Sequence, residues 1–183
     1  MTGNSISDAA KAVVRRGTRE IQGEGNFDVF EELFADDFVD HTTQPGTTPN
    51  KAGVRKLYAH LHEAFPDFHA VIHWQLAEGD RVTTYKTYFG THDGPFLGIA
   101  PTHRKIHFEA IDVMRVQNGK ITDHWGVGNL LFLMQQIGGW TPRSSDAISR
   151  DESISDSAKA VVSRNTEEGQ GKKKFEVFEE DGE

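Results

Sequence analysis

The chain contains no cysteine among its 183 residues, which excludes disulfides, thiolate nucleophiles and cysteine-ligated metals. It also lacks a long hydrophobic run, since the longest aliphatic-rich stretch, Leu130–Met134, is far too short to cross a bilayer. The first residues have no apolar core of the kind found in signal peptides. We therefore expect a soluble, cytoplasmic protein.

The chain has fewer basic than acidic residues, 20 against 28. The net charge is −8, and residues 151–183, with ten acidic and five basic side chains, supply −5 of it. Binding to nucleic acid requires a basic surface that displaces counterions from the phosphates. The one basic cluster, Lys172–Lys174, is interpreted as a solvated segment. We expect neither nucleic acid nor membrane as a partner.

The nine histidines do not show the spacing of a metal site. His60 and His62 are two residues apart on a predicted helix and face different ways, and His62-Glu63 lacks the second histidine of a HExxH motif. His103 and His107 fall in or beside a strand, where four residues span about 13 Å. We expect no metal and no other cofactor.

The motifs of nucleophilic and phosphate-binding sites are missing as well. There is no Gly-x-Ser-x-Gly elbow, and the glycines between Gly90 and Gly98 have neither the GxGxxG spacing nor a GK[ST] ending. The remaining possibilities are general acid–base chemistry and binding without chemistry.

Helices are predicted in the first third of the chain. Ser7 and Asp8 can cap a helix that ends at Gly23, and a short helix is predicted at Phe27–Phe34. Thr48 followed by Pro49 predicts the start of a third helix. The apolar stripe of this third helix consists of Val54, Leu57, Leu61 and Phe65.

Strand-like segments rich in β-branched and aromatic residues follow: His69–Ala77, Arg81–Gly90, Lys105–Gln117 and Lys120–Val127. Turns at Glu78–Asp80 and at Asn118-Gly119 connect neighbouring segments, and Thr91–Arg104 forms a longer loop. The pattern predicts an antiparallel meander. Helices followed by such a sheet make an α+β domain, with the helices on one face of the sheet.

The end of the chain repeats its beginning. Residues Ser5–Glu32 recur as Ser153–Glu180, at a constant offset of 148 residues. The copy replaces Ile21 with Gly169 and Leu33 with Asp181, which weakens the face that would be buried. We divide the chain into a domain at 1–142 and a tail at 143–183 that partly repeats residues 5–35. The tail is predicted to be loosely held, with docking onto a neighbouring copy as the alternative.

Several motifs carry a resemblance: GPFLGIAPT, IDVMRVQNGKI and HWGVGNLLFLMQQIG, which lie between Gly94 and Gly138, and FVDH and AFPDFH upstream. They resemble the SnoaL-like polyketide cyclase and ester cyclase family over about 130 residues. The resemblance implies the cone-shaped NTF2-like fold, with a pocket between helices and sheet. It also implies a homo-oligomer that encloses a hydrophobic, carbonyl-bearing small molecule and acts on it without cofactor or metal.

One position departs from the family pattern. Asn129 stands where the resemblance implies an acidic residue that removes and returns a proton. Regular alternation along the closing strand places Asp123, Trp125 and Asn129 on one face and His124 on the other. If the first face lines the pocket, Trp125 is a wall that packs beside the helix Val54–Phe65. An asparagine amide cannot take up a proton near neutral pH.

Other groups are therefore candidates for the catalytic role: His41, Asp112, His107 and His124. We favour His41, since the resemblance places FVDH near the pocket mouth and its neighbour Asp40 could orient the ring. Each candidate also has a structural interpretation, such as an ion pair between Asp112 and Arg115 or Arg104. Candidate substrate-binding residues are Trp125, Tyr85, Phe96 and Arg115.

Three functions remain open. The first is an enzyme that catalyses cyclisation, an aldol step or isomerisation by acid–base chemistry. The second is a binding module with the same pocket and no chemistry. The third is an assembly protein whose repeated tail joins copies of the chain.

Overall fold

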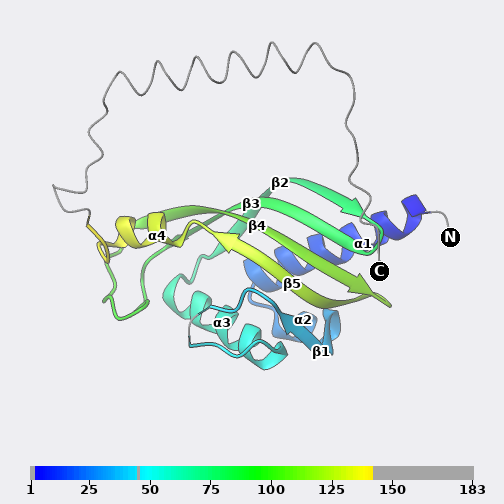
Figure 1. Ribbon diagram of the computed structural model, residues 1–183. Coiled ribbons are helices and arrows are strands. Elements are labelled where there is room, and N and C mark those ends of the chain that lie inside the picture. The colour runs from blue at the N-terminus through cyan, green and yellow to red at the C-terminus, as the bar shows by residue number, and fades with distance from the viewer. Residues whose placement is uncertain (1–2, 45, 142–183) are drawn as a thin grey trace, which may run out of the picture. The chain divides into compact units, whose positions relative to one another are not determined.

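The computed structural model describes residues 3–44 and 46–141. These residues form the following elements, in chain order (Figure 1): α1 (Gly3–Gly17), the π-helical turn η1 (Thr18–Gly23), α2 (Phe27–Leu33), β1 (Phe34–Asp40), α3 (Lys51–Ala64), β2 (His69–Glu78), β3 (Arg81–Thr91), β4 (Lys105–Gln117), β5 (Lys120–Gly128) and α4 (Leu130–Ile137). The predicted α+β class is confirmed.

The sheet has the strand order β1-β5-β4-β3-β2. Strands β2 to β5 pair antiparallel with their sequence neighbours, so the predicted meander is confirmed. Strand β1, which pairs parallel with β5, is a finding that the sequence analysis missed. Its two exposed aspartates, Asp36 and Asp37, interrupt the apolar residues and hide the strand pattern.

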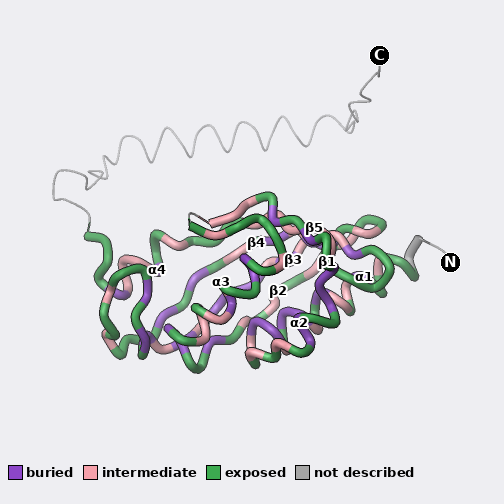
Figure 2. The backbone as a smooth tube through the Cα atoms, turned by 90° about the horizontal axis from the view of Figure 1, so that it is seen from below, coloured by how far each residue is buried: buried purple, intermediate pink, exposed green. Residues whose placement is uncertain are grey.

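Among the described residues, helices cover one face of the sheet and leave much of the other exposed. Helices α1, α2 and α3 lie on the same side (Figure 1), and the even-numbered residues of β4 from Ile106 to Val116 point toward them. Burial alternates along β3 and β4 as period-two geometry requires (Figure 2). We call the covered side the inner face and the other side the outer face.

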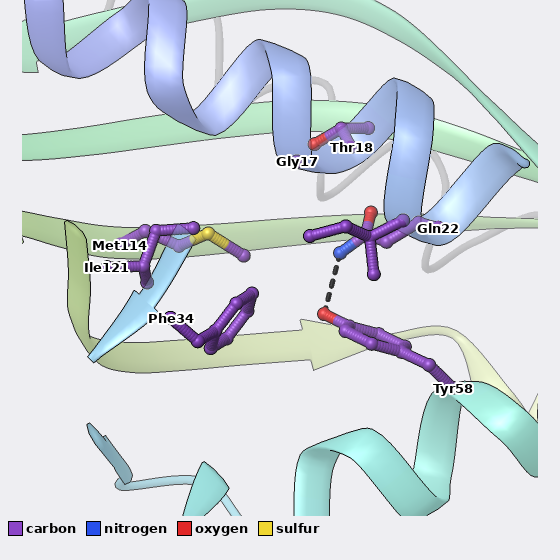
Figure 3. A pocket seen from close by; sticks show the side chains of 8 residues that line it. Gly17, Thr18, Gln22, Phe34, Tyr58, Met114 and Ile121 are labelled. Atoms are coloured by element: carbon purple, nitrogen blue, oxygen red, sulfur yellow. Dashed lines mark hydrogen bonds between the residues drawn. The ribbon is translucent and has the colours of Figure 1, made fainter. Parts of the chain in front are cut away.

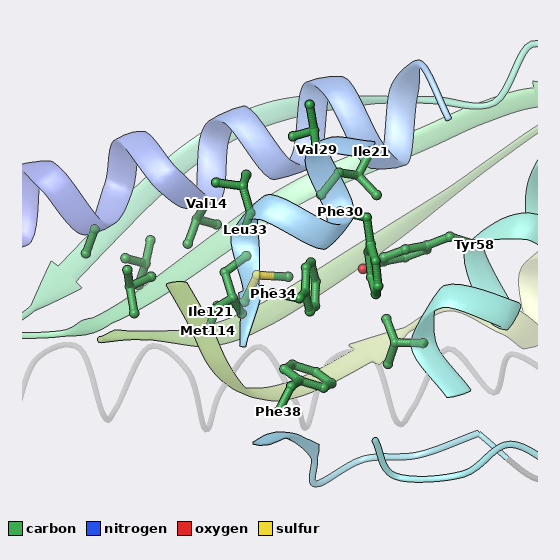
Figure 4. Close-up of a cluster of buried hydrophobic side chains, with 14 residues drawn as sticks. Val14, Ile21, Val29, Phe30, Leu33, Phe34, Phe38, Tyr58, Met114 and Ile121 are labelled. Carbon is green, nitrogen blue, oxygen red and sulfur yellow. The ribbon is translucent and has the colours of Figure 1, made fainter. Parts of the chain in front are cut away.

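Two apolar clusters lie on the inner face. The first joins α1, η1 and α2 to one end of the sheet, with stacked Phe30 and Phe34 at its centre (Figure 4). The second lies at the other end, where Phe65, Phe68 and Phe108 pack with Leu133 and other apolar residues. The space between the two clusters is where the site described below is found.

Helix α3 begins two residues later than predicted. Its N-cap is Asn50, whose Oδ1 accepts a hydrogen bond from the Gly53 backbone N–H at 3.0 Å, rather than Thr48. The Thr48 hydroxyl instead donates to Asn50 Oδ1 at 2.9 Å. Because asparagine caps a helix as well as threonine does, the capping residue changes while the helix itself is confirmed.

Strand β5 contains one extra residue. Val116 of β4 pairs with Ile121 and Arg115 pairs with Asp123, so Thr122 has no partner of its own. Such a β-bulge reverses the facing of every later residue in the strand. Ile121, before the bulge, is buried in the first cluster. Because of the bulge, His124 and Gly126 face inward as well.

No helix among residues 3–44 and 46–141 is long and apolar enough to span a membrane. The predicted tail, 143–183, lies outside the described residues, so its boundary and its role stay predictions.

Removal of the tail tests its role. We expect a chain cut after Arg150 to keep its melting temperature and its oligomeric state, because the copy lacks the equivalents of Ile21 and Leu33, which are almost fully buried in the first cluster. Burial of each such side chain is worth about 1.5 to 3 kcal/mol. Calorimetry and sedimentation measure both properties. A fall of more than a few degrees, or a smaller oligomer, would instead support docking of the tail onto a neighbouring copy.

Candidate functional site

A cavity of about 580 Å³ lies between the inner face of the sheet and α3. Much of its lining is apolar and comes from both clusters, including Val54, Leu57, Leu61, Phe68, Tyr88, Phe96, Phe108 and Leu130. Polar side chains also line it, among them Gln22, Asp40, Thr42, Tyr58, Asp112 and His124. A cavity of this size can enclose a small organic molecule.

His124 is the histidine of the closing strand that lines this cavity. Its Nδ1 lies 2.9 Å from Oδ1 of Asp40, which is itself buried, and Asp40 pairs with His124 across the β1·β5 junction. Asp40 is held in turn by the backbone N–H of Thr42 at 3.0 Å. With Nδ1–H donating to Asp40, the lone pair of the ring is on Nε2.

The charge of Asp40 is stabilised by these contacts. Burial acts to raise the pKa of Asp40, but the hydrogen bonds from His124 and Thr42, together with the charge of His124, outweigh it and lower the pKa below its usual value. The aspartate that orients His124 is therefore ionised near neutral pH.

Asp112 and Lys86 form a second polar group beside His124. Lys86 is fully buried, and its Nζ donates to Oδ2 of Asp112 at 2.6 Å and to Oε1 of Gln22 at 2.9 Å. Nε2 of His124 lies 4.0 Å from the same Asp112 oxygen. Removing one partner of such a buried ion pair would cost about 3 to 5 kcal/mol.

Gln22 links this ion pair to two tyrosines. Its Oε1 accepts from the Tyr88 hydroxyl at 2.9 Å, and its Nε2 donates to the Tyr58 hydroxyl at 2.8 Å (Figure 3). Gln22 is on η1, and π-helical turns are frequent at functional sites. The separate gap between η1 and the sheet, beside Gln22 and Tyr58, leaves no room for a water molecule.

His41 is on the outer face, away from the cavity. Its Nε2 lies 2.9 Å from Oδ1 of Asp123, and its ring stacks on Trp125 with the centroids 4.3 Å apart. Arg115 NH1 lies 3.5 Å from the other oxygen of Asp123. The structure thus brings His41, Trp125 and Arg115 together, but not around the cavity. Trp125 does not pack beside α3 as expected, because the β5 bulge turns it outward.

Three further candidates also lie outside the cavity lining. Asn129 is exposed and caps α4, with its Oδ1 accepting from the Phe132 backbone N–H at 3.3 Å. Tyr85 is on the outer face and donates to Glu109 at 2.6 Å. His107 is exposed on the outer face, where its ring meets Phe132 edge-on.

The cavity thus collects Asp112, His124 and Phe96 from the candidates. Phe96 is buried on the loop between β3 and β4, against Phe65. Sequence reasoning missed Lys86 and Gln22, and it linked Asp40 to His41 rather than to His124. A signal was present: Asp40-His41 and Asp123-His124 are two Asp-His dipeptides, which pair crosswise once β1 and β5 are known to be neighbours.

The lowered pKa of Asp40 leads to a prediction about how the free energy of unfolding depends on pH. A carboxyl group whose folded-state pKa is lowered adds stability above its unfolded-state pKa of about 3.9, and this stability is lost as the pH falls through the folded-state value. We expect Asp40→Asn to cost about 1 to 3 kcal/mol at neutral pH, and the difference from the native chain to shrink below about pH 4. Urea unfolding at several pH values measures this, with exposed Asp37→Asn on the same strand as the control. A difference that does not vary with pH would contradict it.

Comparison with known proteins supports a family assignment. The family model of SnoaL-like polyketide cyclases matches residues 12–137. Nogalonic acid methyl ester cyclase from Streptomyces nogalater is 32% identical over an alignment of 71 residues that covers 35% of this chain and 53% of that protein. The chain thus matches about half the length of this curated relative.

Solved structures agree with this assignment. A candidate polyketide cyclase from Bacillus cereus ATCC 10987 is 27% identical, with a TM-score of 0.64 over 73% of this chain and 83% of that chain. A SnoaL-like protein from Jannaschia sp. CCS1 is 24% identical, with a TM-score of 0.67 over 74% of this chain and 96% of that one, and shows the same fold. The NTF2-like fold implied by the resemblance is confirmed. Since the family model matches more than half of its residues, the chain belongs to the SnoaL-like polyketide cyclase family.

Proposed function

We propose that this protein encloses a hydrophobic, carbonyl-bearing small molecule in the cavity and catalyses proton transfer at a carbon next to the carbonyl group. The reaction is a cyclisation by an aldol step or a related isomerisation. The observation that carries this proposal is the pair His124–Asp40, in which a cavity-lining imidazole is oriented by a buried carboxylate at 2.9 Å. Histidine is the side chain whose ordinary pKa suits both uptake and return of a proton near neutral pH.

In the proposed step, Nε2 of His124 removes a proton from the carbon, and the electron pair of the C–H bond forms an enolate. The enolate carbon attacks a second carbonyl group of the same molecule and forms a carbon–carbon bond. The resulting alkoxide takes the proton back from the imidazolium, so the product is an isomer of the substrate. Asp40 stabilises the imidazolium.

Tyr58 is suited to bind the carbonyl oxygen. Its hydroxyl accepts the hydrogen bond from Gln22, which leaves its own hydrogen for an acceptor in the cavity. Burial raises the pKa of Tyr58, so it stays a neutral donor. A donor aimed at the oxygen where charge develops favours enolate formation.

The alternative function, a binding module without chemistry, was suggested by Asn129 in place of an acidic residue. However, this side chain caps α4 and does not line the cavity. A carboxylate and an imidazole, Asp112 and His124, line the cavity instead.

A pair of histidine variants tests the proposed role of His124. We expect His124→Gln to lower turnover on a panel of polyketide-like and dienone substrates by about 10² to 10⁴-fold, with binding changed only a few-fold. His41→Gln is the matched control, since His41 also pairs with an aspartate at 2.9 Å but on the outer face. It should leave turnover nearly unchanged.

Other outcomes would decide against this assignment. Loss of turnover in His41→Gln, with His124→Gln active, would make His41 the base. Tight binding by the native protein without turnover of any compound would favour the binding module.

The homo-oligomer belongs to the same proposal. Val71 and Leu76 are exposed on the outer face of the sheet, where a second copy could cover them. Sedimentation of the native chain tests this expectation, and a monomer at micromolar concentration would refute it.

A further inference from the structure

Two glycines of β5, Gly126 and Gly128, line the cavity two residues apart on the inner face. Neither has a positive φ, so backbone conformation does not require glycine at either position. What differs between them is the space in front of the backbone.

A side chain at position 126 would meet the ring of His124. A Cβ atom built on Gly126 lies 2.7 Å from Nε2 and 3.0 Å from Cε1 of His124, and 3.5 Å from Cβ of Asp112. Carbon and nitrogen atoms in contact are ordinarily about 3.5 Å apart, so the ring would have to move by roughly 0.8 Å. The ring of His124 therefore lies directly over the backbone of Gly126.

Position 128 offers ordinary contacts instead. A Cβ atom there lies 3.6 Å from Cε2 of Phe108 and 3.9 Å from Cβ of Ala110, so an alanine fits without moving a neighbour. Only Gly126 is coupled to His124.

The contacts around Gly126 tie the place of the ring to its hydrogen bond with Asp40. Asp40 holds Nδ1 from β1 on one side, and Asp112, which pairs with Gly126 across β4·β5, lies on the other. The backbone N–H of Gly126 donates to the Thr42 hydroxyl at 2.8 Å, which fixes the strand beneath the ring. A methyl group at 126 must therefore displace the ring at the expense of its hydrogen bond to Asp40.

We propose that Gly126 is a positioning residue, which holds the ring of His124 in its reactive place by having no side chain. This inference rests on the proposed function for its effect on turnover. Its effect on the ring itself does not depend on that function.

We expect Gly126→Ala to stay folded, with a denaturation midpoint lowered no more than in Asp40→Asn, and to lower kcat by about tenfold to hundredfold, since a misplacement of about 1 Å can cost 10²-fold. KM should change no more than in Gly128→Ala. The second variant adds the same methyl group to the same wall of the cavity, so it measures the effect of a narrower cavity alone, and kcat should fall further in Gly126→Ala than in Gly128→Ala.

Nitrogen-15 chemical shifts of the His124 ring, assigned by their absence in His124→Gln, provide a second readout. We expect the Nδ1–H tautomer in the native chain and in Gly128→Ala, and a mixture of tautomers in Gly126→Ala. A pH–rate profile that moves only in Gly126→Ala would support the same conclusion.

The two readouts separate this inference from the proposed function. A tautomer change confined to Gly126→Ala, in a protein that turns over no substrate, supports the positioning role and counts against the catalytic role. Equal behaviour of the two variants in ring shifts overturns the positioning role, even if both lose turnover through a narrower cavity. A native ring without the Nδ1–H tautomer overturns it as well.

Discussion

The extra residue in β5 determines which side chains can take part in any chemistry. Without the bulge at Thr122, regular alternation from Ile121 would point Asp123 and Trp125 inward and His124 outward. With it, Ile121 still fills the first cluster, while His124 three residues later lines the cavity. One inserted residue thus separates the part of the strand that supports the core from the part that supports the site.

The junction of β1 and β5 depends on the same geometry. Adjacent residues of a strand point to opposite faces, so an Asp-His dipeptide gives one side chain to each face. Two such dipeptides in paired strands make two crossed pairs: Asp40 with His124 on the inner face, and His41 with Asp123 on the outer face. The backbone N–H of His41 also donates to the carbonyl of His124 at 2.9 Å. These contacts fix the end of an edge strand that is anchored in the first cluster by Phe34 and Phe38.

The sequence predicted the elements with strong local signals and missed those decided by tertiary contacts. The hairpin at Asn118-Gly119 and the four-stranded meander were predictable because period-two patterns and turn residues are local. Strand β1 was not, because its pairing partner lies about 80 residues away in the chain. The bulge was not either, since nothing near Thr122 distinguishes it from a regular strand residue. Both misses affect the site directly, which explains why Asn129 and His41 were favoured over His124.

The ion-pair partner of Asp112 also could not be predicted from the sequence. Arg115 was a reasonable partner by distance along the chain, but three residues of strand place the two side chains on opposite faces. The actual partner, Lys86, faces inward from β3. A lysine is buried only where a carboxylate and further hydrogen-bond acceptors surround its amino group. These partners come from distant parts of the chain, so no local sequence pattern predicts a buried lysine.

The position of the polar network follows from the two apolar clusters. Each cluster closes one end of the inner face, and the cavity between them is lined by both apolar and polar side chains. Lys86 donates to Asp112 and Gln22 there, which offsets part of the desolvation of the charges, while Oδ1 of Asp112 has no hydrogen-bond partner among the described residues. Because Lys86 neutralises Asp112, the wall of the cavity can be both buried and polar. His124 lies between this neutral pair and Asp40, and it faces a largely apolar cavity. A histidine in this position suits proton transfer on a hydrophobic substrate.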